Sequence, residues 1–282
     1  MSTFQRWLPR DWRRLDELPE PLWRDTVQGL PYLSSLSGEE LARLRMLSKH
    51  FLLEKDFHGA HGLPITDAMA LTIAAQACLP LLYLPGPGQI NLKDRPLRSL
   101  DWYGDFVGIV VQPGAAIAQR EVIDASGVVH RYRETLAGEA MQGGPVMLSW
   151  AEVARSALAA ETGSNVVIHE FVHKMDMRGT QLGQAADGAP DWSNACLGSL
   201  KGESARAHWR DTMSTAFHNF RDALNMAERF GGETPWLDTY GASQPAEFFA
   251  VTCEAYFVNR ARFGEEFPAL QALYDSFFRP GV

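Results

Sequence analysis

The segment that most constrains the fold is "NVVIHEFVHKMDM", residues 165–177. Its ionisable side chains include His169, Glu170 and His173, which lie among valine, isoleucine, phenylalanine and methionine residues. A helix of this composition is expected to be buried, and burying several ionisable groups is costly unless something satisfies them. The chain must therefore fold so that this helix lies in the interior and its polar residues meet a partner.

The spacing of the two histidines indicates what that partner is. Helical residues four apart lie on the same face, so His169 and His173 can direct two imidazoles at one ion. Glu170 lies about 100° further round the helix, where its carboxylate reaches the edge of the site without binding the ion. This HExxH pattern is typical of zinc hydrolases, in which the glutamate takes a proton from the attacking water.

The residues around this motif support a helix and offer one further polar side chain. Ser164 or Asn165 can cap its start, and Gly179 follows as a residue that can end it. Asp176 follows His173 by three residues and can orient a ligand histidine as a hydrogen-bond acceptor. A helix-capping role or a surface ion pair explains Asp176 equally well.

A zinc site needs a third protein ligand, and the sequence offers two glutamates. The extended pattern HExxHxxGxxH does not apply, because Gly179 stands where its third histidine would be. The segment "SQPAEFFAVTCEAYFVNR", residues 243–260, is predicted to be a helix with Pro245 in its first turn. Glu247 and Glu254 are seven residues apart and share a face of that helix. Periodicity alone leaves the choice between them open.

The other histidines carry no comparable spacing. His208 and His218 are ten residues apart on a predicted helix and do not share a tight face. His58, His61 and His130 have no spacing that indicates a site. We interpret all five as ordinary histidines. The three cysteines form no CxxC pair, which argues against a disulfide framework and a thiolate zinc cluster.

Charge and hydropathy exclude several classes of partner. The formal net charge of -8 argues against a phosphate-binding surface and direct contact with nucleic acid. Residues 1–20 are charged and contain no apolar core of a secretory signal. The most apolar run, residues 68–84, is too short to span a membrane and is interrupted by Gln76 and Pro80. These features predict a cytoplasmic protein without a membrane partner.

The first third of the chain has the pattern of helices. Ser37 and Glu40 have the spacing of a capping box ahead of a helix over residues 38–55. The next helix is apolar nearly all round, with Thr66 as its cap and Pro80 as its stop, which places it in the middle of the core.

Strand patterns begin beyond residue 101. "FVGIVVQ" at 106–112 and "PVMLSW" at 145–150 have strand composition, and residues 120–134 predict a hairpin that turns around 125–127. Helices return after Ser164. This order predicts an α+β fold with a small, mostly antiparallel sheet.

No linker divides the chain into independent parts. We predict a single domain, residues 1–282, of a size that one core can support. In it, residues 1–100 form a mainly helical part. Residues 101–282 hold the sheet, the HExxH helix and the helix with the third ligand.

At this point a resemblance to a known family becomes specific. "NVVIHEFVHKMDMRG" together with "TYGASQPAEFFAV" resembles the Mlc titration factor A (MtfA) family of bacterial zinc peptidases. The similarity extends to "LSWAEV", "LTIAAQACLPLLYL" and "LSGEELARLRMLSKHFL" and covers most of the chain. It implies a zincin-like metallopeptidase core. Residues 180–204 are the part that does not align with the family.

The resemblance also implies roles for individual residues. One Zn²⁺ per chain would be bound by His169, His173 and Glu247, with Glu170 as the catalytic carboxylate. Glu254 then has a structural or supporting role. Tyr240, seven residues before Glu247, corresponds to a tyrosine near the metal in related sites and would donate a hydrogen bond to the oxyanion.

The expected activity is the hydrolysis of peptide bonds in a peptide or protein substrate. An extended substrate can add as a strand to the edge of a sheet, and "GGPVMLSW", residues 143–150, is the expected edge. Exopeptidase and endopeptidase action both remain open.

A second function follows from the same resemblance, because the family is named for sequestering Mlc, a repressor of glucose-uptake genes. The chain would then bind a repressor of this kind and regulate sugar uptake, with a latent or secondary peptidase activity.

Overall fold

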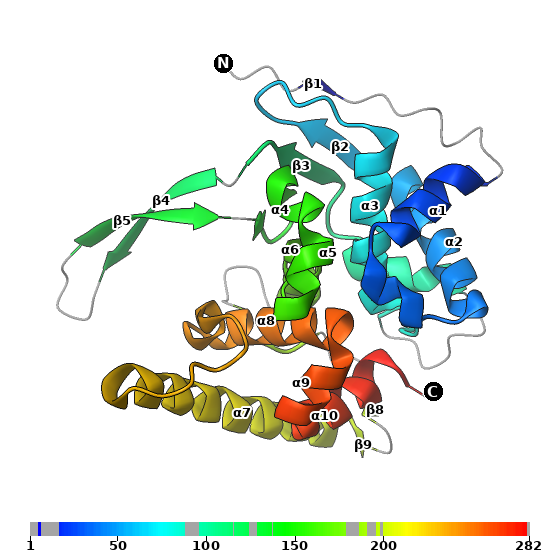
Figure 1. Cartoon of the computed structure of the whole chain (residues 1–282). Coiled ribbons are helices and arrows are strands. Elements are labelled where there is room, and N and C mark those ends of the chain that lie inside the picture. The colour runs from blue at the N-terminus through cyan, green and yellow to red at the C-terminus, as the bar shows by residue number, and fades with distance from the viewer. Residues whose placement is uncertain are drawn as a thin grey trace.

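The chain forms a mostly helical fold with a small sheet, which lies at the top in Figure 1. The computed structural model describes residues 5–6, 17–87, 96–114, 116–123, 129–136, 138–178, 186–190, 196–197 and 200–280. At 5–6, 96, 116–123, 129–136, 139 and 196 only the backbone is described.

The α-helices are α1 (Glu20–Gln28), α2 (Gly38–Glu54), α3 (Asp67–Cys78), α4 (Trp150–Ala154), α5 (Ser156–Ala159), α6 (Val166–Arg178), α7 (Gly202–Phe230), α8 (Pro245–Val258), α9 (Arg260–Glu266) and α10 (Pro268–Phe278). Short 3-10 helices are η2 (Pro31–Ser35), η3 (Leu79–Leu81), η4 (Pro96–Tyr103), η5 (Ala160–Thr162) and η6 (Thr239–Ala242). The strands are β1 (Gln5–Arg6), β2 (Asp56–Gly59), β3 (Gly108–Gln112), β4 (Ala116–Ile123), β5 (Val129–Leu136), β6 (Gly138–Ala140), β7 (Val146–Ser149), β8 (Cys196–Leu197) and β9 (Leu200–Lys201).

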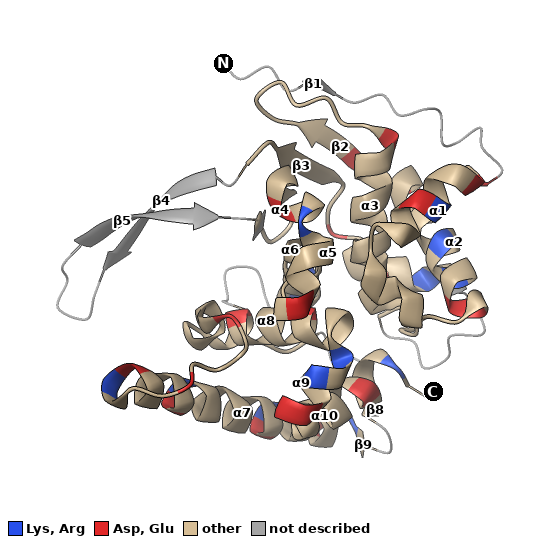
Figure 2. Cartoon of the chain, in the orientation of Figure 1, with Lys and Arg blue, Asp and Glu red and all other residues tan. Residues whose placement is uncertain are grey.

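The helices predicted from capping and periodicity are confirmed. At the start of α2, the Ser37 hydroxyl accepts a hydrogen bond from the Glu40 amide, and the Glu40 carboxylate accepts one from the Ser37 amide. At the start of α3, the Thr66 hydroxyl accepts a hydrogen bond from the Met69 amide. Asp67 is the only charged residue of α3, and Figure 2 shows this helix almost free of charge, whereas α2 and α7 carry both signs.

The prediction of a mostly antiparallel sheet is wrong. The five-stranded sheet has the order β1-β2-β3-β7-β6, and its central strands β2, β3 and β7 run parallel. Only β1 and β6 at the two edges pair antiparallel. Parallel neighbours need a long crossover connection, and α3 lies within the one between β2 and β3. The sequence of β2, "DFHG", is too short and too polar to indicate a strand, so this crossover was missed.

The predicted hairpin and the predicted sheet edge have different outcomes. Strands β4 and β5 pair antiparallel as a separate two-stranded sheet, which confirms the hairpin; its turn lies outside the described residues. The segment 143–150 does not form an edge, because β7 lies between β3 and β6. The edge strand at this end of the sheet is β6.

Below the sheet, α6 and α8 form the next two layers of the molecule, with α7 and α10 beyond them (Figure 1). The Phe171 ring of α6 packs against Phe51, Tyr103 and Phe106, with ring centroids 4.9–5.9 Å apart. On the opposite side of α8, Phe249 packs against the Trp209 ring of α7. The two central helices are therefore clamped by aromatic side chains from both sides. In the part of the chain that the structure describes, no helix has the length and apolar character needed to cross a membrane.

The capping box of α2 generates a stability prediction. Ser37→Ala removes the side-chain acceptor for the Glu40 amide, and we expect the free energy of unfolding to fall by about 1 kcal/mol. Urea denaturation followed by circular dichroism measures this change. Ser34→Ala, an exposed serine of η2, is the control and should change the value by less than about 0.5 kcal/mol. Equal midpoints for the two variants would contradict the role of the capping box.

Candidate metal centre

The position of α6 is fixed at its first turn by Asn165. The Asn165 Oδ1 atom accepts a hydrogen bond from the Ile168 amide at 3.0 Å, so Asn165 is the cap. Its Nδ2 group donates to Gln76 Oε1 of α3 at 2.8 Å and to the Tyr32 hydroxyl at 3.1 Å. Ser164, the other residue proposed as a cap, instead donates to the Glu254 carboxylate. One buried amide side chain thus starts the motif helix and ties it to the N-terminal helices.

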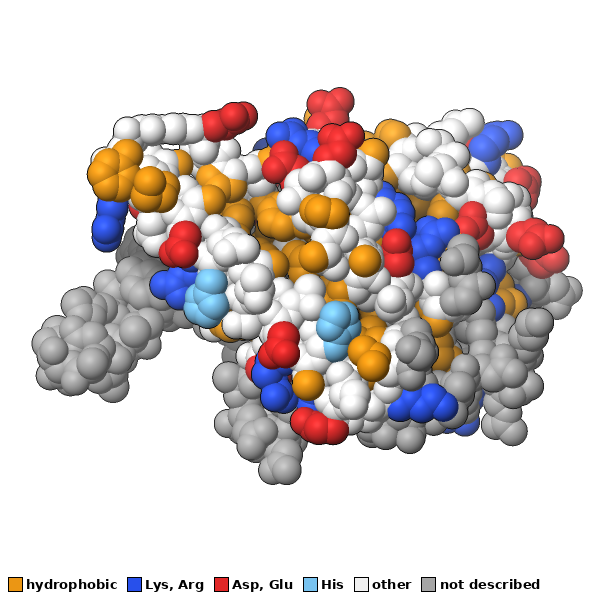
Figure 3. Space-filling view, turned by 90° about the horizontal axis from the view of Figure 1, so that it is seen from below, with side chains coloured by type: hydrophobic (Ala, Val, Ile, Leu, Met, Phe, Trp, Pro, Cys, Tyr) orange, Lys and Arg blue, Asp and Glu red, His pale blue; other side chains and the backbone are white. Residues whose placement is uncertain are grey.

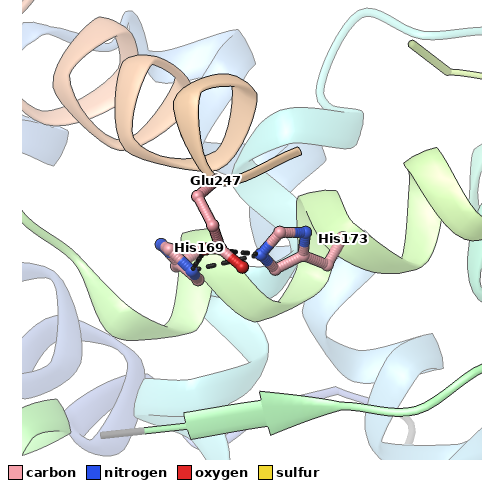
Figure 4. Close-up of side chains that lie close together, drawn as sticks. All are labelled: His169, His173 and Glu247. Atoms are coloured by element: carbon pink, nitrogen blue, oxygen red, sulfur yellow. Dashed lines mark hydrogen bonds and ion pairs between the residues drawn. The ribbon is translucent and has the colours of Figure 1, made fainter. Parts of the chain in front are cut away.

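Three of the predicted site residues converge between α6 and α8 (Figure 4). Glu247 Oε2 lies 3.0 Å from His169 Nε2 and 3.2 Å from His173 Nε2. The two Nε2 atoms are 3.2 Å apart. One ligand atom from each of these residues therefore lies within 4.8 Å of the others, close enough to bind one metal ion.

The two glutamates of α8 occupy opposite sides of His169. Glu254 Oε1 lies 2.7 Å from His169 Nδ1, whereas Glu247 lies against Nε2. The second oxygen of Glu254 accepts a hydrogen bond from the backbone amide of Asn165. A carboxylate that accepts from Nδ1 keeps the proton there and leaves the Nε2 lone pair for a metal. The two glutamates share a helix face, as predicted, but make different contacts with His169.

The electrostatics of this cluster favour a bound positive charge. Burial lowers the pKa of His169, but the carboxylates of Glu254 and Glu247 outweigh it and hold that pKa well above its usual value. Burial raises the pKa of Glu247, and the two imidazoles more than reverse the shift, so the pKa falls below its usual range. A site that retains a proton in this way also suits a divalent cation, which supplies the same charge compensation to the buried carboxylates.

Glu170 lies on another side of α6, underneath β6. Its side chain is only 4% exposed. A Cβ atom at Gly138 of β6 would lie 2.5 Å from Glu170 Oε1, closer than atoms approach. Glycine at this position therefore allows the edge strand to pass directly over the carboxylate.

Lys174 holds that edge strand in place, a role that the sequence analysis did not identify. Its ammonium group is fully buried and donates to the carbonyl oxygens of Met141 and Gly144 at 2.7 and 3.0 Å, in the connection between β6 and β7. It also pairs with Asp105 at 3.2 Å. A lysine within the apolar run of the motif helix is the sequence signal for this contact, because a buried ammonium needs several acceptors.

Tyr240 lies at the outer side of the cluster. Its ring centroid is 6.5 Å from that of His169, and the residue is 39% exposed. It belongs to η6, where its amide donates to Asp238 Oδ1. The structure thus places this predicted residue next to one of the two histidines and open to solvent.

Asp176 is fully buried, which excludes the surface ion pair considered for it. Its buried carboxylate accepts hydrogen bonds from the backbone amides of Asp187, Gly188 and Ala189 at 2.9–3.3 Å. Burial raises its pKa to about 6, against the opposing effect of the Gly188 amide. Asp176 therefore anchors part of the segment 180–204, the region that the family resemblance did not cover.

None of the other histidines whose side chains the structure describes belongs to the cluster. His208 and His218 are exposed on α7, His61 is exposed, and His58 is half-buried in β2. The side chain of His130 lies outside the described residues.

Comparison with known proteins assigns this chain to a family. A family model described as "Glucose-regulated metallo-peptidase M90" matches residues 4–279. The chain belongs to this family. Membership of the M90 family implies a metal cofactor and confirms the resemblance drawn from the motifs.

Relatives of this chain come from the genera Salmonella and Enterobacter. A protein named Mlc titration factor A from Salmonella arizonae is 31% identical over 258 residues, which covers 92% of this chain and 90% of the relative. The protein of the same name from Salmonella gallinarum is 30% identical over 257 residues, covering 91% and 85%. The one from Enterobacter sp. strain 638 is 29% identical over 270 residues, covering 95% and 90%. The similarity therefore extends over almost the whole of both chains.

The contact between Gly138 and Glu170 generates a prediction for this site. Gly138→Ala should displace either the Glu170 carboxylate or β6, and we expect peptide hydrolysis to fall by about tenfold or more because catalysis is sensitive to small misplacements. The metal content should stay unchanged, because no ligand candidate touches this position. Gly114→Ala, where an added Cβ meets no atom within 4 Å, is the matched control. Full activity of Gly138→Ala would show that the close approach is unimportant.

Proposed function

We propose that this chain is a zinc-dependent peptidase and that His169, His173 and Glu247 bind the zinc ion. The observation that carries the proposal is the convergence of two imidazole nitrogens and one carboxylate oxygen within 4.8 Å. Two histidines and one glutamate are a ligand set of catalytic zinc sites, which leave a fourth position open for water or substrate. Glu254, 2.7 Å behind His169, gives the first histidine the orientation that such a ligand needs.

Bound zinc would lower the pKa of a water molecule and polarise the scissile carbonyl. Glu170 is the residue proposed to take the proton from the attacking water and deliver it to the leaving amine. Its position beside the two histidines, on the same helix but on another side, supports this role. Tyr240 is proposed to donate a hydrogen bond from its hydroxyl group to the developing oxyanion. Its partly exposed position beside His169 supports that assignment.

The substrate is proposed to bind as an extra strand along β6. This strand forms the edge of the sheet and lies against Glu170 through Gly138. A peptide paired with such an edge exchanges backbone hydrogen bonds with it and brings its carbonyl groups past the site. The sheet edge above the motif helix also supports the finer assignment of a zincin-like core. Activity on peptides with a free amino terminus and on blocked peptides distinguishes exopeptidase from endopeptidase action.

A regulatory binding function is the second candidate. The observation that favours it is the name of the relatives, Mlc titration factor A. In this alternative the chain sequesters a transcriptional repressor of the Mlc type, and hydrolysis is secondary. The two functions separate in a Glu170→Gln variant, because binding of the repressor should survive a change that stops hydrolysis. A pull-down of purified repressor with the wild type and this variant makes the comparison.

The ligand assignment generates a prediction about metal content. The purified protein should hold about one zinc ion per chain, as expected for one set of three protein ligands. Glu247→Ala leaves two histidines, and its zinc should be removed by a mild chelator. Glu254→Ala should keep zinc with an affinity roughly 10–100-fold lower, the usual effect of losing a group that orients a ligand. Atomic absorption after chelator competition measures both, and the reverse order would refute the assignment.

The proposed proton acceptor generates a second prediction. Glu170→Gln keeps the shape of the side chain but cannot accept a proton, so hydrolysis of a peptide substrate should fall by about 10²–10⁴-fold. Zinc content should equal that of the wild type. Glu161→Gln, an exposed glutamate in η5, is the matched control and should keep full activity. Turnover at the wild-type rate in Glu170→Gln would exclude Glu170 as the base.

A further inference from the structure

A pocket lies on the opposite side of α8 from the histidines. Its volume is about 370 Å³, and its walls are α7, the first turn of α8 and the segment 187–190. Phe248, one of its lining residues, packs on the rings of Phe217 and Phe220 from α7, whereas the preceding residue, Glu247, faces α6. The pocket is therefore separated from the metal cluster by the body of α8.

The inner part of this pocket is apolar. Trp209, Met213, Phe217 and Phe248 line it and are all at least 93% buried. The Phe217 and Phe248 ring centroids are 5.5 Å apart, and Trp209 stacks on Tyr274 behind the pocket at 5.6 Å. Pockets of this size and lining accept the apolar part of a small ligand.

The outer part carries two arginines and one carboxylate, Asp187, which is exposed. Arg206 and Arg210 line the pocket and are exposed. They are four residues apart on α7, so they lie one above the other on one face. Among the residues that the structure describes, neither arginine forms an ion pair. Figure 3 looks onto the side of the molecule where α7 is nearest, and apolar, basic, acidic and histidine side chains are all exposed on it.

The wall formed by the segment 187–190 is held in place by hydrogen bonds. Gly188 donates its amide to the buried Asp176 at 2.9 Å and accepts the Trp209 indole N–H at 2.9 Å. Its φ of +79° favours glycine, and a Cβ here would lie 2.7 Å from the Pro245 carbonyl oxygen. The segment is thus held on both sides, which gives the pocket a preformed shape.

We propose that this pocket binds an apolar carboxylate: a ligand with an aromatic or aliphatic body and one carboxylate group. The apolar body fills the space between Trp209, Met213 and Phe248, and the carboxylate meets the guanidinium groups of Arg206 and Arg210. Arginine pairs with carboxylates through charge-assisted hydrogen bonds of defined geometry. Two sources supply this chemistry, a free carboxylic acid and the C-terminal residue of a peptide. The site is independent of the proposed hydrolysis.

Isothermal titration calorimetry with N-acetyl-L-phenylalanine and with its C-terminal amide tests the chemistry of the ligand. The two probes share the apolar body and differ in the carboxylate. We expect the acid to bind the wild-type protein and the amide to bind about tenfold more weakly or worse, as for loss of a hydrogen-bonded charged group. Equal affinity for both probes, or no measurable binding of the acid, would overturn the proposal.

Matched variants of α7 test the location. Ser214→Phe fills the pocket from an exposed position and should abolish binding, whereas Thr215→Phe adds the same ring to the neighbouring exposed residue outside the lining and should not. The double variant Arg206→Gln, Arg210→Gln should lose affinity about tenfold. Arg229→Gln, exposed near the other end of α7, is the control for charge.

Binding measurements with two further variants show whether the ligand lies in this pocket or at the metal cluster, and which of the two sources supplies it. Binding of the acid should persist in His173→Ala. Loss of binding there, with full binding in Ser214→Phe, would place the ligand at the metal cluster and refute the proposal.

Titration of a hexapeptide ending in phenylalanine, with the Glu170→Gln protein to prevent cleavage, compares the sources. Tighter binding than that of N-acetyl-L-phenylalanine identifies the peptide C-terminus, and equal or weaker binding identifies the free acid.

Discussion

The contact of His169 with two glutamates of α8 is the interaction around which the rest of the structure is arranged. Glu254 lies 2.7 Å from one nitrogen of the imidazole and Glu247 lies 3.0 Å from the other. All three side chains are largely removed from water, so any shift between α6 and α8 would leave a buried carboxylate without a partner, at a cost of several kcal/mol. This requirement fixes the distance between the two helices and the position of one along the other.

Other polar residues of α6 use the same principle to fix the surroundings of the site. The Lys174 ammonium anchors the connection between β6 and β7, and the Asp176 carboxylate anchors the segment 187–189. At the start of the helix, Asn165 ties it to Gln76 of α3. Side chains of α6 and of its cap Asn165 thus position the edge strand, a wall of the proposed carboxylate pocket and the N-terminal helices.

The two sides of α8 are suited to different chemistry. The side facing α6 carries carboxylates that meet the imidazoles of α6. This combination suits a metal ion and the hydrolysis proposed for this member of the M90 family. The side facing α7 carries Phe248 and Phe249, which pack on aromatic rings of α7. Because one rigid helix carries both surfaces, the proposed carboxylate pocket and the metal cluster are built on a common support while remaining physically separate.

Local features of this chain were determined by its sequence, and contacts between distant segments were decided by the tertiary structure. The spacing of His169 and His173, the capping box of Ser37 and Glu40, and the shared face of the two glutamates follow from helix geometry, which depends only on residues within a turn or two. Which glutamate lies against both histidines depends on how α8 packs on α6, and here only the resemblance to a family indicated an answer. The parallel order of β2, β3 and β7, the edge position of β6 and the anchoring role of Lys174 join residues far apart in the chain. Such pairings are chosen by packing and by the need to satisfy buried polar groups, and four residues such as "DFHG" in β2 carry too little pattern to specify a partner strand.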